Sequence, residues 1–134
     1  PTLSSAASDV YKRQIQELST CLQYNLPIKI ININNEALGM VKQWQDMNYS
    51  GRHSESTYQS SLPDFVKLTE SYGHVGIKIE KNSDLKSGLE HAFSMKDKLV
   101  FVDVYVDPGE HVYPMLVAPN GSLKDMWLDK GKKA

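Results

Sequence analysis

Three short runs of apolar, largely β-branched residues, separated by stretches with helical periodicity, constrain the fold of this chain more than any other feature. The runs cover residues 27–33, 74–79 and 99–106. In the last run valine recurs at every second position from Val100 to Val106, as on one face of a strand. Runs this apolar are typical of a sheet covered on both sides. The pattern therefore predicts an α/β fold with a parallel sheet between two layers of helices, joined by right-handed crossovers.

The stretches between the runs carry apolar residues at helical spacing. We expect helices over residues 15–24 and 37–48, a third that begins with Ser61 as its cap and Pro63 in its first turn, and a fourth that opens at Ser83. Glycine at position 73 is a natural stop for the third helix. The residues expected to line one side of their helices are Leu18, Cys21, Leu22, Met40, Val41, Trp44, Met47, Phe65, Leu68, Tyr72, Leu85, Leu89 and Phe93.

Two segments have neither period. Residues 49–60 are polar and contain Gly51, so we expect an exposed loop, and a loop of this length is uncommon unless it serves a function or is disordered. After the last strand the chain turns at residues 107–109 and leaves the sheet as a tail. We therefore expect residues 107–134 to form an arm separate from the sheet.

Composition limits the class of protein. With 134 residues, 40% of them hydrophobic, the chain suits one globular domain. A net charge of -1 offers no field for nucleic acid or an anionic membrane surface, and no apolar run approaches the about 20 residues that span a bilayer. Cys21 is the single cysteine, so an intrachain disulfide and a cysteine-based zinc site are excluded, and a packing role is expected for it. We expect a cytoplasmic protein with no nucleic-acid or membrane partner.

The first run ends in two asparagines, Asn34 and Asn35. In open parallel sheets, ligands bind beyond the carboxyl ends of the strands. An asparagine oxygen there, with a backbone carbonyl two residues later, suits Mg²⁺, which completes its shell with phosphate oxygens and water. The helix beginning near Ala37 points its N–H groups toward the same place, which favours a diphosphate. The alternative interpretation of the two asparagines is a turn or helix cap.

A longer motif then points to a family. Residues 34–45, Asn-Asn-Glu-Ala-Leu-Gly-Met-Val-Lys-Gln-Trp-Gln, resemble the end of the thiamine-diphosphate motif of the catalytic large subunit of acetolactate synthase, or acetohydroxyacid synthase, in its bacterial form. The resemblance extends from residue 15 to about residue 130. It implies the three-layer thiamine-diphosphate-binding fold, which is flavodoxin-like or Rossmann-like. The other segments that carry it are residues 15–20, 49–54, 62–65, 72–74, 100–104 and 110–115.

The resemblance also implies roles for individual residues. Asn35 would bind Mg²⁺ through its side chain and Ala37 through its backbone carbonyl, while Gly39 and Met40 would lie beside the cofactor. Trp44 would select the second 2-oxo acid. The alternative for Met40 and Trp44 is packing within the protein. The residues implied for the substrate pocket are Met40, Val41 and Trp44, and those implied for cofactor binding are Asn35, Ala37, Gly39 and Met40.

The polar loop and the tail resemble two mobile segments of enzymes in the same family. The loop around Arg52 and His53 resembles the mobile loop that closes over the active site. Residues 111–127 resemble the C-terminal arm that joins in this closure. The alternative for Arg52 and His53 is that they are solvated loop residues.

The implied enzyme decarboxylates pyruvate and condenses the two-carbon unit with pyruvate or 2-oxobutyrate. The products are acetolactate or acetohydroxybutyrate, precursors of branched-chain amino acids. The resemblance implies thiamine diphosphate and Mg²⁺ as cofactors, and FAD bound mainly outside this segment. The implied partners are a second large subunit, which completes the active site in a homodimer, and a regulatory small subunit.

The match to the family breaks at the N-terminus. The motif begins with Gly-Asp-Gly, which should fall at positions 7–9, where this chain has Ala-Ser-Asp. We expect residues 1–14 to be foreign or mistranslated sequence, residues 15–106 to be a truncated cofactor-binding domain, and the fragment alone to be inactive without a complete catalytic set. The alternative function is a non-catalytic, flavodoxin-like binding or interaction module. A related thiamine-dependent decarboxylase or oxidase is disfavoured by residues 40–45.

Overall fold

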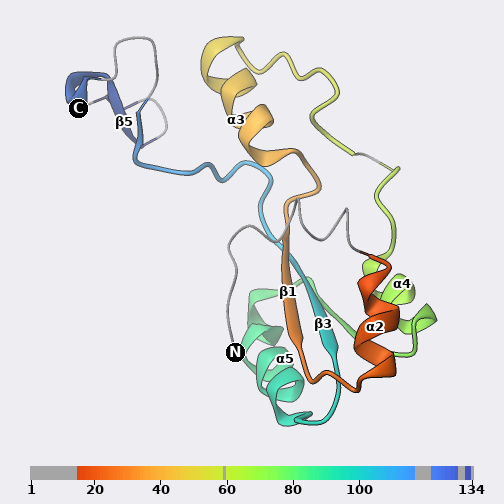
Figure 1. Cartoon of the computed structure of the whole chain (residues 1–134). Coiled ribbons are helices and arrows are strands. Elements are labelled where there is room, and N and C mark those ends of the chain that lie inside the picture. Colours follow the sequence, from red (N-terminus) through yellow and green to blue (C-terminus); the bar gives the residue numbers. More distant parts are fainter. Residues whose placement is uncertain (1–14, 59, 117–121, 130–131, 134) are drawn as a thin grey trace. The chain divides into compact units, whose positions relative to one another are not determined.

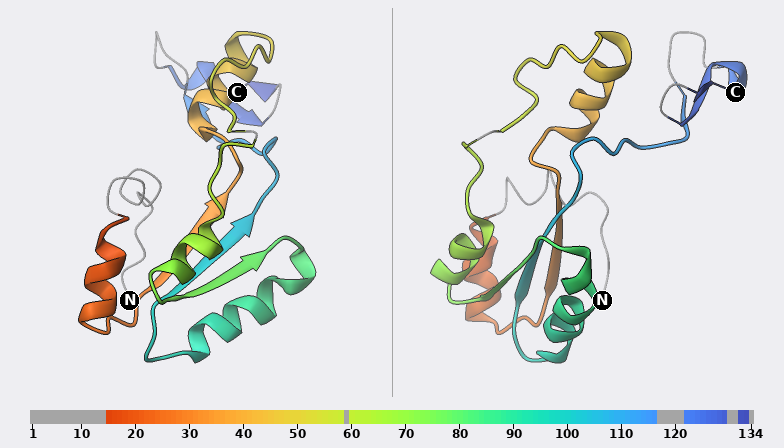
Figure 2. Two further views of the ribbon diagram at one scale, coloured as in Figure 1. Left: turned by 90° about the vertical axis from the view of Figure 1, so that its right-hand side faces the viewer. Right: turned by 180° about the vertical axis from the view of Figure 1, so that it is seen from behind.

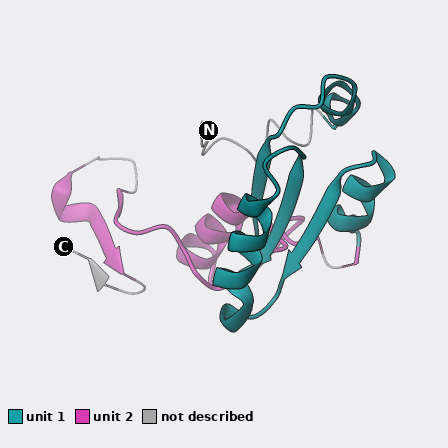
Figure 3. Ribbon diagram, turned by 90° about the horizontal axis from the view of Figure 1, so that it is seen from below, with its two compact units in different colours: residues 1–34, 61–106 teal, residues 35–60, 107–134 magenta. Residues whose placement is uncertain are grey.

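The computed structural model describes residues 15–58, 60–116, 122–129 and 132–133. The expected foreign segment, residues 1–14, lies outside this described part of the chain. The chain divides into two compact units, shown in teal and magenta in Figure 3. The first unit comprises residues 1–34 and 61–106, and the second comprises residues 35–60 and 107–134. The polar loop and the arm thus belong to one unit, and the parallel sheet to the other.

The first unit is built on a parallel sheet, as predicted. Its strands are β1 (Lys29–Asn34), β2 (Val75–Ile79) and β3 (Val100–Tyr105), in the order β1-β3-β2 (Figure 1). The most apolar run, β3, occupies the central position, where strands cover both of its edges and helices cover both faces. All three strands begin and end within two residues of the predicted runs.

Helices cover both faces of this sheet. Figure 2 shows α2 (Glu17–Gln23) and α4 (Phe65–Ser71) on one face and α5 (Asn82–Ser94) on the other. Side-chain alternation along β3 produces this arrangement. Its valines form one core with residues of β2 and α5, whereas the ring of Phe101 faces Phe65 of α4 at 5.9 Å between centroids. The three-layer α/β prediction is therefore confirmed.

The predicted start of α4 is wrong by one turn. The N-cap is Asp64, whose carboxylate accepts the N–H of Lys67 at 3.0 Å, and Ser61 lies outside the helix. Aspartate caps a helix as well as serine does, and Pro63 stands before the cap and outside the first turn. The predicted stop is confirmed, because Gly73 follows the helix with a φ of 81°.

The start of α5 also differs from prediction. The helix begins at Asn82, one residue before Ser83, whose hydroxyl donates to Asp84 at 2.8 Å. Leu85 and Leu89 pack against the valine core as expected. Phe93, the third residue of this series, is 48% exposed. Each step of four residues turns about 40° beyond a full turn of the helix, so the side chain of Phe93 is rotated away from the direction of Leu85.

The second unit holds α3 (Gly39–Asn48), the polar loop and the arm. As predicted, the described residues between α3 and α4 form no helix or strand beyond one isolated bridge between Ala37 and Thr57. The predicted turn is confirmed by the N–H of Gly109, which donates to the Asp107 carboxylate at 2.7 Å. No described helix is long and apolar enough to cross a membrane.

The arm contains a small antiparallel sheet that the sequence pattern does not predict. Its strand order is β4-β5-β6, and the pairing joins Met115 to Trp127 and Leu116 to Met126. Strands this short carry no recognisable period, which explains the omission. The elements are β4 (Met115–Leu116), the 3₁₀ helix η1 (Leu123–Asp125), β5 (Met126–Asp129) and β6 (Lys132–Lys133).

Candidate functional site

A buried carboxylate holds the carboxyl end of β1. Asp103 on β3 is only 2% exposed and accepts the side-chain amides of Asn32 at 2.7 Å and Asn34 at 3.2 Å. Burial raises the pKa of Asp103, and the two amide hydrogen bonds only partly oppose that shift. A buried carboxylate is costly unless it is hydrogen-bonded, so Asp103 fixes both asparagines on one side of β1. The last residue of the strand is therefore rigidly placed.

Asn35 follows directly, at the start of the second unit. Its side-chain oxygen accepts the N–H of Ala37 at 3.2 Å, and Glu36 between them has a φ of 54°. This is an Asx turn, so the alternative interpretation as a turn residue holds for Asn35, whereas Asn34 is the last residue of β1. An amide oxygen has two lone pairs, and one hydrogen bond leaves the second for another donor or a cation. The turn does not conflict with the predicted metal role of Asn35.

The next feature is the close approach of Gly39 to Asn35. A Cβ atom at position 39 would lie 2.8 Å from the amide nitrogen of Asn35, so any larger residue would displace that side chain. The helix α3 begins at Gly39, and Leu38 at its N-cap supplies no side-chain hydrogen bond. The first-turn N–H groups of α3 therefore have no side-chain cap, which is the arrangement that an anionic group at a helix N-terminus requires.

The predicted pocket residues all lie in the first two turns of α3. Met40 is 52% exposed and Val41 45% exposed, while Trp44 is partly buried. Packing within the described structure therefore does not account for Met40. The one fully buried residue of the helix is Gln43. Gly39, Met40, Val41 and Trp44 are brought together on one helix that starts four residues after Asn35.

Gln43 is a site residue that the sequence analysis did not single out. Its amide nitrogen donates to the backbone carbonyl of Val112 at 2.9 Å, and its amide oxygen accepts the N–H of Val112 at 3.0 Å. The side chain thus pairs with both backbone groups of one arm residue. Gln43 stands among other polar residues, Lys42, Gln45 and Asp46, so the sequence carries no signal that sets it apart.

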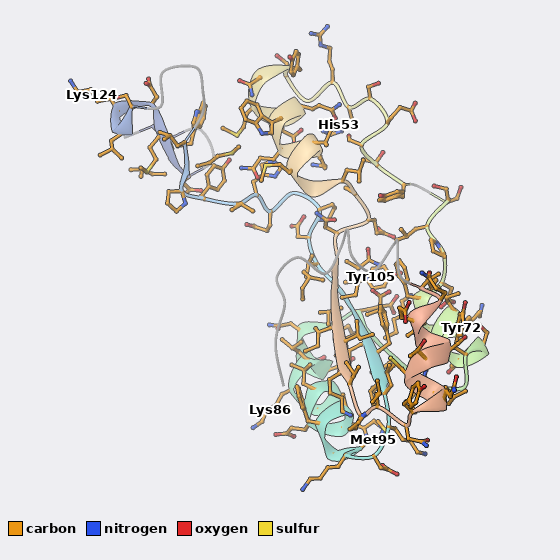
Figure 4. The ribbon with its side chains drawn as sticks, in the orientation of Figure 1. His53, Tyr72, Lys86, Met95, Tyr105 and Lys124 are labelled. Carbon is orange, nitrogen blue, oxygen red and sulfur yellow. The ribbon has the colours of Figure 1, made fainter. Side chains whose placement is uncertain are left out.

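Asp46 is a second residue missed in this way. Its carboxylate lies 2.6 Å from Nε2 of His53 and 2.9 Å from Nε2 of His111, and Lys42 contacts it at 2.9 Å. An ionised carboxylate only accepts, so Nε2 of His53 donates to it, while His111 lies within ion-pair distance. Burial raises the pKa of Asp46, but the hydrogen bonds from Lys42 and His53 outweigh burial and lower the pKa to about 2. Figure 4 labels His53, on the loop after α3.

Arg52, the residue next to His53 in the expected mobile loop, does not contact Asp46 in the way that His53 does. Nε of Arg52 donates to the backbone carbonyl of Tyr49 at 3.2 Å, and Arg52 is exposed. This contact is local, which fits the alternative of a solvated loop residue. A second α3 side chain holds the loop, since the amide nitrogen of Gln45 donates to the carbonyl of Ser54 at 3.0 Å.

A separate pocket of about 270 Å³ lies at the amino ends of β2 and β3. Its lining includes Cys21, His74 and Leu99. Burial, with a smaller contribution from the charge of Glu17, raises the pKa of Cys21, which disfavours the thiolate. Ligands of open parallel sheets bind at the other, carboxyl end of the strands. This pocket is therefore not a candidate for the cofactor site, and the packing role of Cys21 stays a prediction.

Fold and site together resemble one class of cofactor-binding domain, and comparison with known proteins shows the family. Residues 8–104 match the family described as thiamine pyrophosphate enzyme, C-terminal TPP binding domain. The chain therefore belongs to this family. A solved 4-hydroxybenzoylformate decarboxylase from Rhodococcus jostii, described as thiamine diphosphate-dependent, shares the fold with a TM-score of 0.63. The match has 23% sequence identity and covers 75% of this chain and 18% of the decarboxylase chain.

The curated relatives are more specific. The acetolactate synthase large subunit of Haemophilus influenzae is 62% identical over 116 residues, which cover 87% of this chain and 20% of that protein. The acetolactate synthase isozyme 3 large subunit of Escherichia coli is 58% identical over 121 residues, which cover 89% of this chain and 21% of that protein. The predicted resemblance is confirmed. The chain spans about a fifth of the length of these relatives.

Proposed function

We propose that this chain forms the diphosphate-binding part of the cofactor site in an acetolactate synthase large subunit. The observation that carries the proposal is the continuous arrangement of Asn35, Gly39 and the exposed pocket residues of α3 directly after the carboxyl end of β1. The relatives are named acetolactate synthase large subunits, and nothing in the comparisons supports a non-catalytic interaction module. When bound, thiamine diphosphate supplies the decarboxylation and carbon–carbon bond-forming chemistry.

The residues present fit half of a Mg²⁺ site. The Asn35 side-chain oxygen and the Ala37 backbone carbonyl are oxygen ligands of the kind Mg²⁺ prefers. Gly39 has no Cβ, which leaves room for the Asn35 side chain. Both ligands are neutral. The described residues contain no group of three or more His, Cys, Asp or Glu side chains that could hold a metal. The diphosphate, or a carboxylate from elsewhere in the enzyme, must therefore supply the negative charge that offsets dehydration of the ion.

The substrate pocket is proposed to include Met40, Val41 and Trp44. Their exposure on α3 provides an apolar and aromatic surface for the alkyl part of a 2-oxo acid. Pyruvate is the donor, and pyruvate or 2-oxobutyrate the acceptor. An apolar wall of this kind excludes water from the reacting carbon and distinguishes the acceptors by one methylene.

The remaining assignments follow from the relatives. The word "large" in their names favours a regulatory small subunit as a partner, and a second large subunit is proposed to complete the active site. FAD would bind mainly outside this segment. We propose a cytoplasmic location, without a nucleic-acid or membrane partner.

A chimera tests the proposal. In it, this chain replaces the matching segment of the Haemophilus influenzae protein, and acetolactate formation from pyruvate is measured while Mg²⁺ is varied. Asn35→Ala should raise the half-saturating Mg²⁺ concentration by about tenfold or more, the scale on which the groups around a metal act. Asn82→Ala, the same change at an exposed helix start, should leave it unchanged. A chimera that forms no acetolactate contradicts the activity, and an unchanged Mg²⁺ requirement contradicts the role of Asn35.

A further inference from the structure

Helix α3 contacts two segments that follow it in the chain, the polar loop and the arm. The backbone N–H of Leu38, just before the helix, donates to the carbonyl of Ser56, and the side chain of Gln45 reaches Ser54, both in the loop. Gln43 reaches Val112 in the arm, and Asp46 receives one histidine from each segment. The cofactor role proposed above uses none of these contacts. We call the contacts of Gln43 and Asp46 with His53, His111 and Val112 the clasp.

The Gln43 part of the clasp joins one side chain to both backbone groups of a single arm residue. Both backbone groups of Val112 are paired by one side chain, as they would be by a neighbouring strand. Gln43 is 1% exposed, so its amide stays out of water and needs both hydrogen bonds. The sulfur of Met115 lies 3.1 Å from the same amide nitrogen. The arm therefore cannot shift along α3 by a residue without leaving a buried amide unpaired.

The Asp46 part joins the loop to the arm. His53 contacts one carboxylate oxygen and His111 the other, and Lys42 contacts the same oxygen as His111. The side chain of His111 is 5% exposed, which makes this contact the more deeply buried of the two. One carboxylate thus fixes loop and arm to the same turn of α3.

The clasp is next to the proposed pocket residues on the helix surface. At about 100° per residue, Met40 and Trp44 lie within about 100° of Gln43 on one side, and Asp46 lies about 60° away on the other. A rotation of α3 by about 10° moves a side-chain tip at a radius of about 6 Å by about 1 Å. Misplacement on that scale is enough to change how a substrate is held. Contacts that prevent such rotation are therefore relevant to selectivity.

We infer that Gln43 and Asp46 are positioning residues: by clasping the arm and the loop to α3 they set the orientation of Met40 and Trp44 toward the second 2-oxo acid. This inference rests on the proposed function, because it assigns these two side chains to the acceptor pocket. It assigns no chemical step to Gln43 or Asp46. A purely structural role would change stability and leave the choice of acceptor unaltered.

The clasp itself is tested on the purified 134-residue chain by amide hydrogen exchange. Gln43→Leu should abolish protection of the Val112 N–H, whose acceptor is lost, while Gln23→Leu at an exposed position of α2 should preserve it. His111→Leu should speed exchange of neighbouring arm amides, and His111→Gln, which keeps an N–H donor, should restore slow exchange. Circular dichroism checks that each variant is folded. Equal exchange at Val112 in wild type and Gln43→Leu would overturn the inference.

The positioning role is tested in the chimera by competition between pyruvate and 2-oxobutyrate. Gln43→Leu and His111→Leu should change the product ratio by about threefold or more, part of the roughly tenfold that one methylene allows. Gln23→Leu and His111→Gln should leave the ratio as in the wild type. If Gln43→Leu removes the exchange protection of the Val112 N–H but leaves the product ratio unchanged, the positioning role is overturned. The proposed function is not affected by that result. An inactive wild-type chimera would contradict the proposed function. Amide hydrogen exchange on the 134-residue chain would still test whether the clasp contacts exist.

Discussion

At the scale of single residues, the chemistry of this chain depends on which oxygen and aromatic groups remain accessible around α3. Asn35 uses one lone pair of its side-chain oxygen in a turn, and Gly39 is small enough to leave that side chain in place. Met40 is exposed although it belongs to an apolar helical stripe. A predicted apolar stripe therefore includes positions that the described chain does not use for its own core.

Trp44 is expected to determine the choice of acceptor. In the chimera, Trp44→Leu should change the ratio of acetohydroxybutyrate to acetolactate by about tenfold, because a broad aromatic face can discriminate one methylene by roughly 1–3 kcal/mol. Its effect on the midpoint of urea unfolding should be small, since Trp44 is only partly buried. Phe93→Leu, which truncates an exposed aromatic residue on α5, is the control. An unchanged product ratio would make Trp44 a packing residue.

Asp46 is expected to make stability depend on pH in a defined window. Its pKa in the folded protein is about 2, below its usual value of 3.8, so folding favours the ionised form. The contribution is present above about pH 5, amounts to about 2 kcal/mol, and is lost progressively as the pH falls through about 2. The difference in free energy of unfolding between wild type and Asp46→Asn should thus be clearly smaller at pH 2.5 than at pH 6. Urea denaturation at both values measures this, and a constant difference would contradict it.

At the scale of elements, the sheet of the first unit depends on close packing on both faces. Gly76 in β2 lies against α4, where an added Cβ would approach Cγ1 of Val66 to 2.7 Å and its Cα to 2.9 Å. A side chain end can rotate away, but a helix backbone cannot move without disturbing the Phe65–Phe101 contact behind it. The distance between strand and helix is therefore set by the glycine.

Gly76→Ala is accordingly expected to destabilise the chain by about 1–3 kcal/mol, the cost of overpacking a filled interface. Gly109→Ala is the matched control, because its added Cβ would meet only the mobile end of the exposed Asp107 side chain at 3.1 Å. That change should alter the free energy of unfolding by less than about 0.5 kcal/mol. Thermal or urea unfolding of the two variants decides the matter, and equal stabilities would refute the packing argument.

At the scale of the whole molecule, the chain matches a family of cofactor-binding domains but spans about a fifth of its curated relatives. The resemblance implies that a second large subunit completes the active site and that FAD binds mainly outside this segment. The purified 134-residue chain should therefore form no acetolactate from pyruvate when thiamine diphosphate and Mg²⁺ are added. Calorimetric titration should show binding weaker than micromolar. Turnover above that of buffer would contradict this expectation.

The sequence by itself determined the class of fold and the family. Alternating valines from Val100 to Val104 and the apolar run before Asn34 depend on neighbours along the chain, and this local periodicity is what a sequence displays directly. The two asparagines could be placed at the end of a strand for the same reason, with Asn34 as its last residue and Asn35 just after it. Even the error at Ser61 was local, because two good capping residues stood three positions apart.

Only the tertiary structure decided the strand order, the grouping of loop with arm, and the clasp. Gln43 and Val112 are 69 residues apart, and the backbone of any residue offers the same two groups to a glutamine amide. Such a contact leaves no pattern in the sequence on either side. His53 and His111 likewise converge on Asp46 only because the chain returns to α3 after completing the sheet. Pairing over long separations is selected by the packing of the whole chain, which local periodicity does not encode.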